Sequence, residues 1–383
     1  MKADTLIVNG RLYDPAANID RTGNLAIWHR RIVSLDAKAD TPAARVINAE
    51  GCLVLPGLID LHTHISRWST HIGMNPDIGG IANGVTAMVD CGSSGVSNFR
   101  AVLRNLEHYE VKSKLVLHVS AGGQMMSTQF AENVDPACWN LDLFERAFEE
   151  YPDRIIGIKI RPAKEVVREL GLAPFEAALR LADHLHTRLF IHATNPAADM
   201  GTICSMMRPG DVVSHIFHGE GHTLLSDGGR IDERVWQAQR RGVIMDVAQG
   251  QGNLSLDLAQ QCMASGFLPD TVSTDLNNAN LYHPLVFTLL MTMTKMLAAG
   301  MPLERVIRGV TAVPASVMGL SGELGTLAEG TVGDVSVLKL VDRPMRFRDR
   351  YGAYIEAEKV FMPMATVING MVQYQSSETF VCG

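Results

Sequence analysis

The segment Leu53–His64, LVLPGLIDLHTH, gives the clearest indication of the fold. Its first seven residues, Leu53–Ile59, form an apolar run, which is typical of a strand buried on both faces of a parallel sheet. The predicted strand, Leu53–His62, ends in a histidine, and His64 lies two positions further on. Because side chains two apart on a strand point to the same face, both imidazoles are expected on one side of the sheet.

Outward from this stretch, buried-looking strands alternate with helical segments. The eight predicted strands are Leu53–His62, Val85–Cys91, Leu115–Ser120, Ile155–Ile160, Leu189–Ala193, Val212–Phe217, Val243–Val247 and Thr271–Asp275. Helices are expected at Asp142–Tyr151, Pro174–His186, Glu233–Arg241 and Pro284–Ala299. Eight such units over about 260 residues predict an α/β fold, a distorted (β/α)₈ TIM barrel. An open doubly wound sheet is the main alternative, but the first predicted strand is not followed by the GxGxxG of its common nucleotide-binding form.

The two ends of the chain differ from the central part, because their sequences predict short strands and turns. Leu6–Val8 runs into the turn dipeptide Asn9-Gly10, and Ala365–Ile368 runs into Asn369-Gly370. Each end is too small to form a core alone, so the two are predicted to pair. We therefore predict a small β-sandwich domain built from residues 1–55 and 322–383, and a hydrolase barrel of residues 56–321.

Composition narrows the class of protein. The 383 residues include 34 basic and 41 acidic side chains, a net charge of −7, which argues against nucleic acid or an anionic membrane as partner. No apolar run reaches the ~18 residues of a membrane span, and the first residues do not resemble a secretion signal. Six scattered cysteines fit a reducing compartment. We expect a cytoplasmic homo-oligomer with a small-molecule substrate.

Six ionisable residues fall at or near the ends of predicted strands one, four, five, six and eight: His62, His64, Lys159, His192, His215 and Asp275. The carboxyl ends of all barrel strands converge on one face, where such enzymes carry their active sites. Taken singly, a histidine here could be a core residue and Asp275 could cap a helix. Lys159 lies between isoleucines and needs a partner or a neutral form, because an unpaired buried ammonium costs several kcal/mol. Together, the six predict a metal site.

Several runs resemble the amidohydrolase superfamily. Pro56–His64 is similar to its strand-one signature, and Gly325–Asp334 resembles the return to its small β-domain. The order of the six residues is similar to the binuclear subtype, which includes dihydroorotases and hydantoinases. Gly157–Arg161, His215–Gly219 and Ser273–Leu276 look closest to the bacterial amidohydrolase/deacetylase branch, which is dihydroorotase-like.

The residue types suit two divalent ions, with Zn²⁺ expected and Mn, Ni, Co or Fe possible. His62, His64 and Asp275 would hold the more buried ion, and His192 and His215 the more exposed one. The resemblance implies that Lys159 carries a CO₂-derived carbamate that bridges the ions. The ions would activate a shared hydroxide, with Asp275 as general base and then acid.

Five further polar residues are predicted substrate contacts: Arg67, Arg161, His218, Gln249 and Asn277. A guanidinium at a barrel mouth can bind a carboxylate through two hydrogen bonds, although the two arginines could also be surface ion-pair residues. His218 could instead support the metal ligands, and Asn277 could be an ordinary turn residue.

The predicted activity is hydrolysis of an amide or ester bond, other than a peptide bond, in a small acylated anionic compound. The alternatives are a cyclic amidohydrolase such as a dihydroorotase, and a catalytically silent scaffold relative. Silent relatives tend to lose metal ligands, whereas all six residues are present here.

Overall fold

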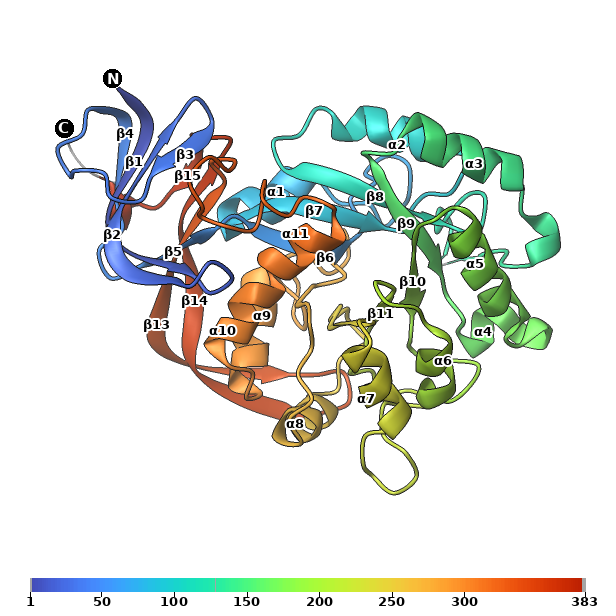
Figure 1. Cartoon of the computed structure of the whole chain (residues 1–383). Coiled ribbons are helices and arrows are strands. Elements are labelled where there is room, and N and C mark those ends of the chain that lie inside the picture. Colours follow the sequence, from blue (N-terminus) through green and yellow to red (C-terminus); the bar gives the residue numbers. More distant parts are fainter. Residues whose placement is uncertain (1, 128, 381–383) are drawn as a thin grey trace.

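A computed structural model describes residues 2–127 and 129–380 and shows two sheets (Figure 1). The first is parallel, with its seven strands in sequence order: β6 (Leu58–Thr63), β7 (Val85–Cys91), β8 (Lys112–His118), β9 (Ile155–Ile160), β10 (Arg188–His192), β11 (Val212–Ser214) and β12 (Ile244–Asp246). Nearly every residue of these strands is buried, which explains the continuous apolar runs in the sequence.

Residues 271–276 close this sheet into a barrel. A parallel bridge joins Asp246 to Thr271 on one side, and another joins Thr63 to Leu276 on the other. The expected strand at Thr271–Asp275 is thus in place, but it makes isolated bridges rather than a regular ladder. The predicted barrel is confirmed, with its distortion at this eighth position.

Buried acids on the two neighbouring strands add side-chain hydrogen bonds to the backbone ones of this segment, such as that from the Val247 N–H to the Thr271 carbonyl at 3.1 Å. Asp246 Oδ1 accepts hydrogen bonds of 2.7 Å from the hydroxyls of both Thr271 and Ser273. Across the barrel, Asp60 accepts from the Thr274 hydroxyl at 2.6 Å and from its backbone N–H at 3.1 Å. The hydroxyl residues of this short segment therefore hold it in place between the first and seventh strands.

Helices follow most of the barrel strands and cover the barrel: α1 (Pro76–Gly80), α2 (Phe99–Leu106), α3 (Leu141–Glu150), α4 (Lys164–Val167), α5 (Ala173–His184), α6 (Met200–Met206), α7 (Glu233–Arg240), α8 (Leu256–Ala264), α9 (Leu289–Ala298), α10 (Leu303–Gly309) and α11 (Ala312–Val317). The helix expected at Pro284–Ala299 begins only at Leu289. Leu285 and Phe287 have φ values of 87° and 75°, which no α-helix contains. Within the described residues, no helix is both long and apolar enough to cross a bilayer.

The second sheet contains strands from both ends of the chain: β1 (Ala3–Asp14), β2 (Ile19–Trp28), β3 (Arg31–Ser34), β4 (Ala43–Asn48), β5 (Leu53–Pro56), β13 (Val335–Arg348), β14 (Tyr354–Ile368) and β15 (Met371–Gln375). It folds over a core of its own, in which Ile7, Leu25 and Val54 pack with Val337 and Ala365. The predicted sandwich of terminal strands is confirmed.

The segment predicted as one strand, Leu53–His62, is two strands separated by Gly57. β5 pairs with β13 in the terminal sheet, whereas β6 pairs with β7 in the barrel. A side chain at Gly57 would place its Cβ 2.3 Å from the hydroxyl of Thr86, so glycine is required where the chain passes between the sheets. We propose that the sheets mark two domains, residues 1–55 with 322–383 and residues 56–321.

The hairpin of β13 and β14 extends well beyond the terminal sheet. In Figure 1 its two red strands pass below α9 and α10 and reach α8. At the hairpin tip, Asp349 is buried and accepts a hydrogen bond of 2.8 Å from the backbone N–H of Leu256, the first residue of α8. The terminal strands therefore contact the loops at the end of the barrel.

Candidate metal centre

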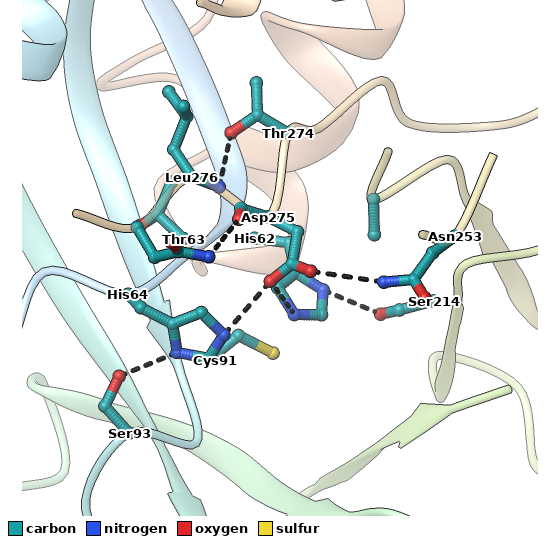
Figure 2. A network of polar contacts seen from close by, with 12 residues as sticks. His62, Thr63, His64, Cys91, Ser93, Ser214, Asn253, Thr274, Asp275 and Leu276 are labelled. Atoms are coloured by element: carbon teal, nitrogen blue, oxygen red, sulfur yellow. Dashed lines mark hydrogen bonds and ion pairs between the residues drawn. The ribbon is translucent and has the colours of Figure 1, made fainter. Parts of the chain in front are cut away.

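Three of the predicted ligands meet at the end of the first barrel strand (Figure 2). His62 lies near the end of β6, and His64 directly follows that strand. Asp275 lies beside them in the segment that closes the barrel. His64 Nε2 is 3.0 Å and His62 Nε2 is 3.7 Å from Asp275 Oδ1. Their ligand atoms all lie within 4.8 Å of one another, so the three residues could hold a metal ion.

Two further histidines extend the cluster. His192 is the last residue of β10, and His215 directly follows β11. The centroids of these two rings are 4.3 Å apart, and the rings of His62 and His215 are 5.0 Å apart. Residues from four separate segments of the sequence thus bring four imidazoles and one carboxylate to one place.

The backbone is strained at two of these residues. His215 has a φ of 67° and Asp275 a φ of 56°, in the left-handed region that non-glycine residues rarely adopt. Asp275 is held there because its backbone N–H donates a hydrogen bond of 2.7 Å to the carbonyl of His62. Such strain is typical of functional sites, where the surrounding structure imposes it.

The histidines are oriented so that Nε2 faces the cluster. In three of them Nδ1 has a hydrogen-bond partner: Ser214 Oγ for His62 at 3.0 Å, Ser93 Oγ for His64 at 2.8 Å and the Ala248 carbonyl for His215 at 2.6 Å. Partners of this kind fix the ring orientation of metal-binding histidines and leave the other nitrogen for the ion. Burial, more than any neighbouring charge, lowers the pKa of His62, His192 and His215 well below the usual range. Their neutral form is the one that binds metal.

Asp275 is ionised in this setting. Burial by itself would raise its pKa, but the hydrogen bond to His64 and the nearby His215 and His62 outweigh burial and lower the pKa below its usual range. Its second oxygen, Oδ2, accepts a hydrogen bond of 3.3 Å from the side-chain amide of Asn253, on the loop after β12. Oδ1 therefore faces the histidines, while Oδ2 faces that loop (Figure 2).

Lys159 lies within β9, and its side chain is fully buried beside the cluster. Its Nζ is 3.2 Å from His62 Nε2 and 3.3 Å from the sulfur of Cys91. No carboxylate of the described residues forms an ion pair with this amine. Gly92 makes room for it, since a Cβ there would lie 2.8 Å from Lys159 Cγ. A buried lysine without a carboxylate partner is costly to the fold unless a further group compensates its charge.

The two arginines predicted to contact substrate differ in how near they lie to the cluster of histidines. Arg161 lies near the cluster, because its charge contributes, after burial and His215, to the lowered pKa of His192. It also forms an ion pair of 2.8 Å with Glu132. The side chain of Arg67 instead stacks on exposed Trp68 at 4.6 Å, and the structure does not bring it against the histidines.

The other three predicted contacts differ in whether their side chains already form hydrogen bonds within the protein. The Gln249 amide is occupied on both sides, by the Leu285 carbonyl and by the Thr292 hydroxyl. The Asn277 side chain forms a turn, accepting from the backbone of Ala279 at 2.9 Å. His218 is fully buried, and neither of its ring nitrogens has a hydrogen-bond partner among the described residues.

His118, the last residue of β8, also lies beside the cluster and was not among the predicted site residues. The strand register pairs it with Lys159, and its Nδ1 accepts from the backbone of Ser120 at 3.0 Å. Burial lowers its pKa to about 4, so the ring is neutral and Nε2 carries a proton. In the described parts of the chain, that buried Nε2 has no partner, nor do Glu132 Oε2 and Arg161 Nε. Its position at a strand end, which selected the other histidines, could have identified it.

Known proteins share this fold. The amidohydrolase family matches residues 53–372. A deacetylase of Agrobacterium fabrum is 30% identical over 336 residues, 88% of this chain and 81% of its own. A dihydroorotase of Syntrophotalea carbinolica is 47% identical over only 60 residues, 16% of this chain and 14% of its own. A crystal structure of a dihydroorotase superimposes with a TM-score of 0.88 at 28% identity, over 97% of this chain and 99% of that one. These matches confirm the predicted hydrolase class, and the chain belongs to the amidohydrolase family.

Proposed function

We propose that this protein is a metal-dependent deacetylase that hydrolyses an amide or ester bond in a small acylated anion. The observation that carries the proposal is the convergence of His62, His64, His192, His215 and Asp275 on one point beside the uncompensated amine of Lys159. The deacetylase relative covers most of this chain, whereas the curated dihydroorotase relative matches a short stretch.

Two divalent ions, expected to be Zn²⁺, would be held by this cluster. His62, His64 and Asp275 would bind one ion, and His192 and His215 the other. The amine of Lys159 would attack CO₂ at carbon and lose one proton, and the carbamate so formed would supply a further anionic ligand for the ions. When bound, such ions polarise the substrate carbonyl and lower the pKa of water.

Asp275 would transfer the proton of the attacking water. Because Oδ1 of Asp275 faces the histidines, Oδ2 is the oxygen free to accept a proton from the attacking water. It would then pass that proton to the nitrogen or oxygen of the leaving group. The amide of Asn253 would hold Oδ2 in position during both transfers.

The acid of the substrate would be recognised by Arg161 and His118. Both are buried or nearly so, and each carries an N–H without a partner in the described structure. A substrate carboxylate would accept both hydrogen bonds, which are stronger when charge-assisted. His218 is a second group of this kind, whereas the engaged side chains of Gln249 and Asn277 would shape the loops around the substrate.

Cyclic amide hydrolysis, as by a dihydroorotase, is the second candidate, because a dihydroorotase structure superimposes over nearly the whole chain. We further propose a cytoplasmic homo-oligomer without a nucleic-acid partner, on the ground of the chain's composition and net charge of −7.

The test is a turnover screen of the metal-loaded protein against N-acetyl and O-acetyl carboxylic acids of both hands, with dihydroorotate alongside. Release of acetate from one of these acids is the expected result. Turnover of dihydroorotate alone would favour the second candidate, and a fully metal-loaded protein inactive on all of them would favour a silent scaffold.

A further inference from the structure

A second buried lysine lies away from the six clustered residues. Lys295, in the last turn of α9, is 2% exposed. Its ammonium donates a hydrogen bond to the carbonyl of Leu285 and lies 5.3 Å from the centre of the Phe347 ring, on β13. Among the described residues no carboxylate forms an ion pair with it, and burial alone lowers its pKa to about 7. A buried cation without a counter-anion is costly, and hydrophobic packing does not require it.

Lys295 borders a cavity of about 300 Å³ between α9, the loop that precedes it and β13. The walls are mostly apolar, and Phe287, Met291 and Phe347 supply much of them. Arg348 also lines the cavity, and its guanidinium has no hydrogen bond or ion pair with another described side chain. The cavity thus combines apolar walls with unneutralised positive charge.

The loop beside the cavity supplies an independent observation. Leu285 and Phe287 both have positive φ values, of 87° and 75°, although both are bulky residues for which this conformation is strained. This conformation turns the Leu285 carbonyl toward both Lys295 and the amide of Gln249. Strain of this kind persists where the surrounding structure imposes it, commonly at ligand sites.

We propose that this cavity binds a small-molecule carboxylate with an apolar body, and that Lys295 and Arg348 together bind the acid. The apolar part of the ligand would lie against Phe287, Met291 and Phe347. Its carboxylate would be the counter-anion of Lys295, which has none among the described residues. The site shares none of its lining residues with the cluster around Asp275, so its occupant need not be the substrate of the hydrolase.

Calorimetry on the full chain tests this with 3-phenylpropanoate and its neutral amide, 3-phenylpropanamide, as matched probes. We expect the carboxylate to bind and the amide to bind at least about tenfold more weakly, since charge-assisted hydrogen bonds exceed neutral ones. Lys295→Met and Arg348→Gln should each weaken carboxylate binding about tenfold or more. Arg348 is exposed, so its variant preserves the fold even if Lys295→Met does not.

Arg343→Gln is the control, because Arg343 is exposed on the same strand and does not line the cavity. It should bind the carboxylate like the wild type. Three results would overturn the proposal: no binding of the carboxylate, equal binding of the amide, or unchanged binding in both cavity variants.

Discussion

The hydroxyl of Tyr351 donates a hydrogen bond of 2.8 Å to the carbonyl of Gly252 and accepts one of 3.2 Å from the backbone N–H of Gly219. Tyr351 lies at the tip of the hairpin from the terminal sheet, and the two glycines lie on loops after β12 and β11. The next residue after Gly252 is Asn253, whose amide donates to Asp275. A single tyrosine thus joins the second sheet to the loop that positions the proposed general base.

Tyr351→Phe should lower kcat about threefold to tenfold, because one net hydrogen bond is worth about 1 kcal/mol. Steady-state kinetics with equal metal loading measures this effect. Tyr354→Phe, an exposed change on the same hairpin, is the control and should have no effect. Equal kinetics for the two variants would remove Tyr351 from this role.

The Asp275→Asn variant should still bind substantial metal. Its kcat should fall by a factor of about 10²–10⁴, which is the usual contribution of a general acid–base group. The amide keeps an oxygen for the ion but cannot accept the proton. Metal analysis and turnover on the same sample measure the two properties. Near-normal turnover in a metal-loaded variant would show that another residue moves the proton.

Arg161→Gln combined with Glu132→Gln should raise KM for an acidic substrate about tenfold or more while changing kcat less. Both members of the ion pair are replaced because Glu132 is buried and would otherwise be left as an unpaired charge. The corresponding methyl ester of the substrate is the control, and its KM should be unaffected. A rise in KM that is the same for acid and ester would contradict recognition of the carboxylate.

Lys295→Met should stabilise the fold in a pH-dependent way. Burial lowers the pKa of Lys295 from 10.5 to about 7, so between these values the unfolded chain binds a proton that the folded chain does not. As pH falls through this window, the wild type loses about 1.4 kcal/mol of unfolding free energy per pH unit, and the variant does not. Denaturant unfolding at pH 7 and above pH 10 should show a gain that is largest at pH 7. A gain that does not change with pH would contradict a buried lysine whose pKa is lowered.

Sequence patterns predicted much of the barrel, because buried parallel strands such as β7 and β9 leave continuous apolar runs whose ends are easy to place. They did not predict the details that glycine or side-chain hydrogen bonds set. The break at Gly57 depends on the close approach of Thr86. The segment Thr271–Asp275 lies where the eighth strand was expected, but its irregular pairing and the bonds from its hydroxyls to Asp60 and Asp246 were not predicted. Neither contact has a periodic signature.

Some parts of the candidate site could likewise be predicted from the sequence, and others could not. The proposed ligands could be predicted because strand ends converge in a barrel, whatever the loops do. The surroundings of the substrate could not, because they depend on long loops and on the distant hairpin that carries Tyr351. His118 could have been predicted by the same rule, since it also ends a barrel strand.

The metal content of the purified protein, measured by elemental mass spectrometry and compared with that of Lys159→Met, tests whether the cluster is a metal centre. If the cluster is one binuclear centre, the wild type should carry about two transition-metal ions per chain and the variant about one or none, since the bridging anion is lost. A wild-type protein that binds no transition metal under metal-replete conditions, or a variant that binds as much as the wild type, would contradict the account.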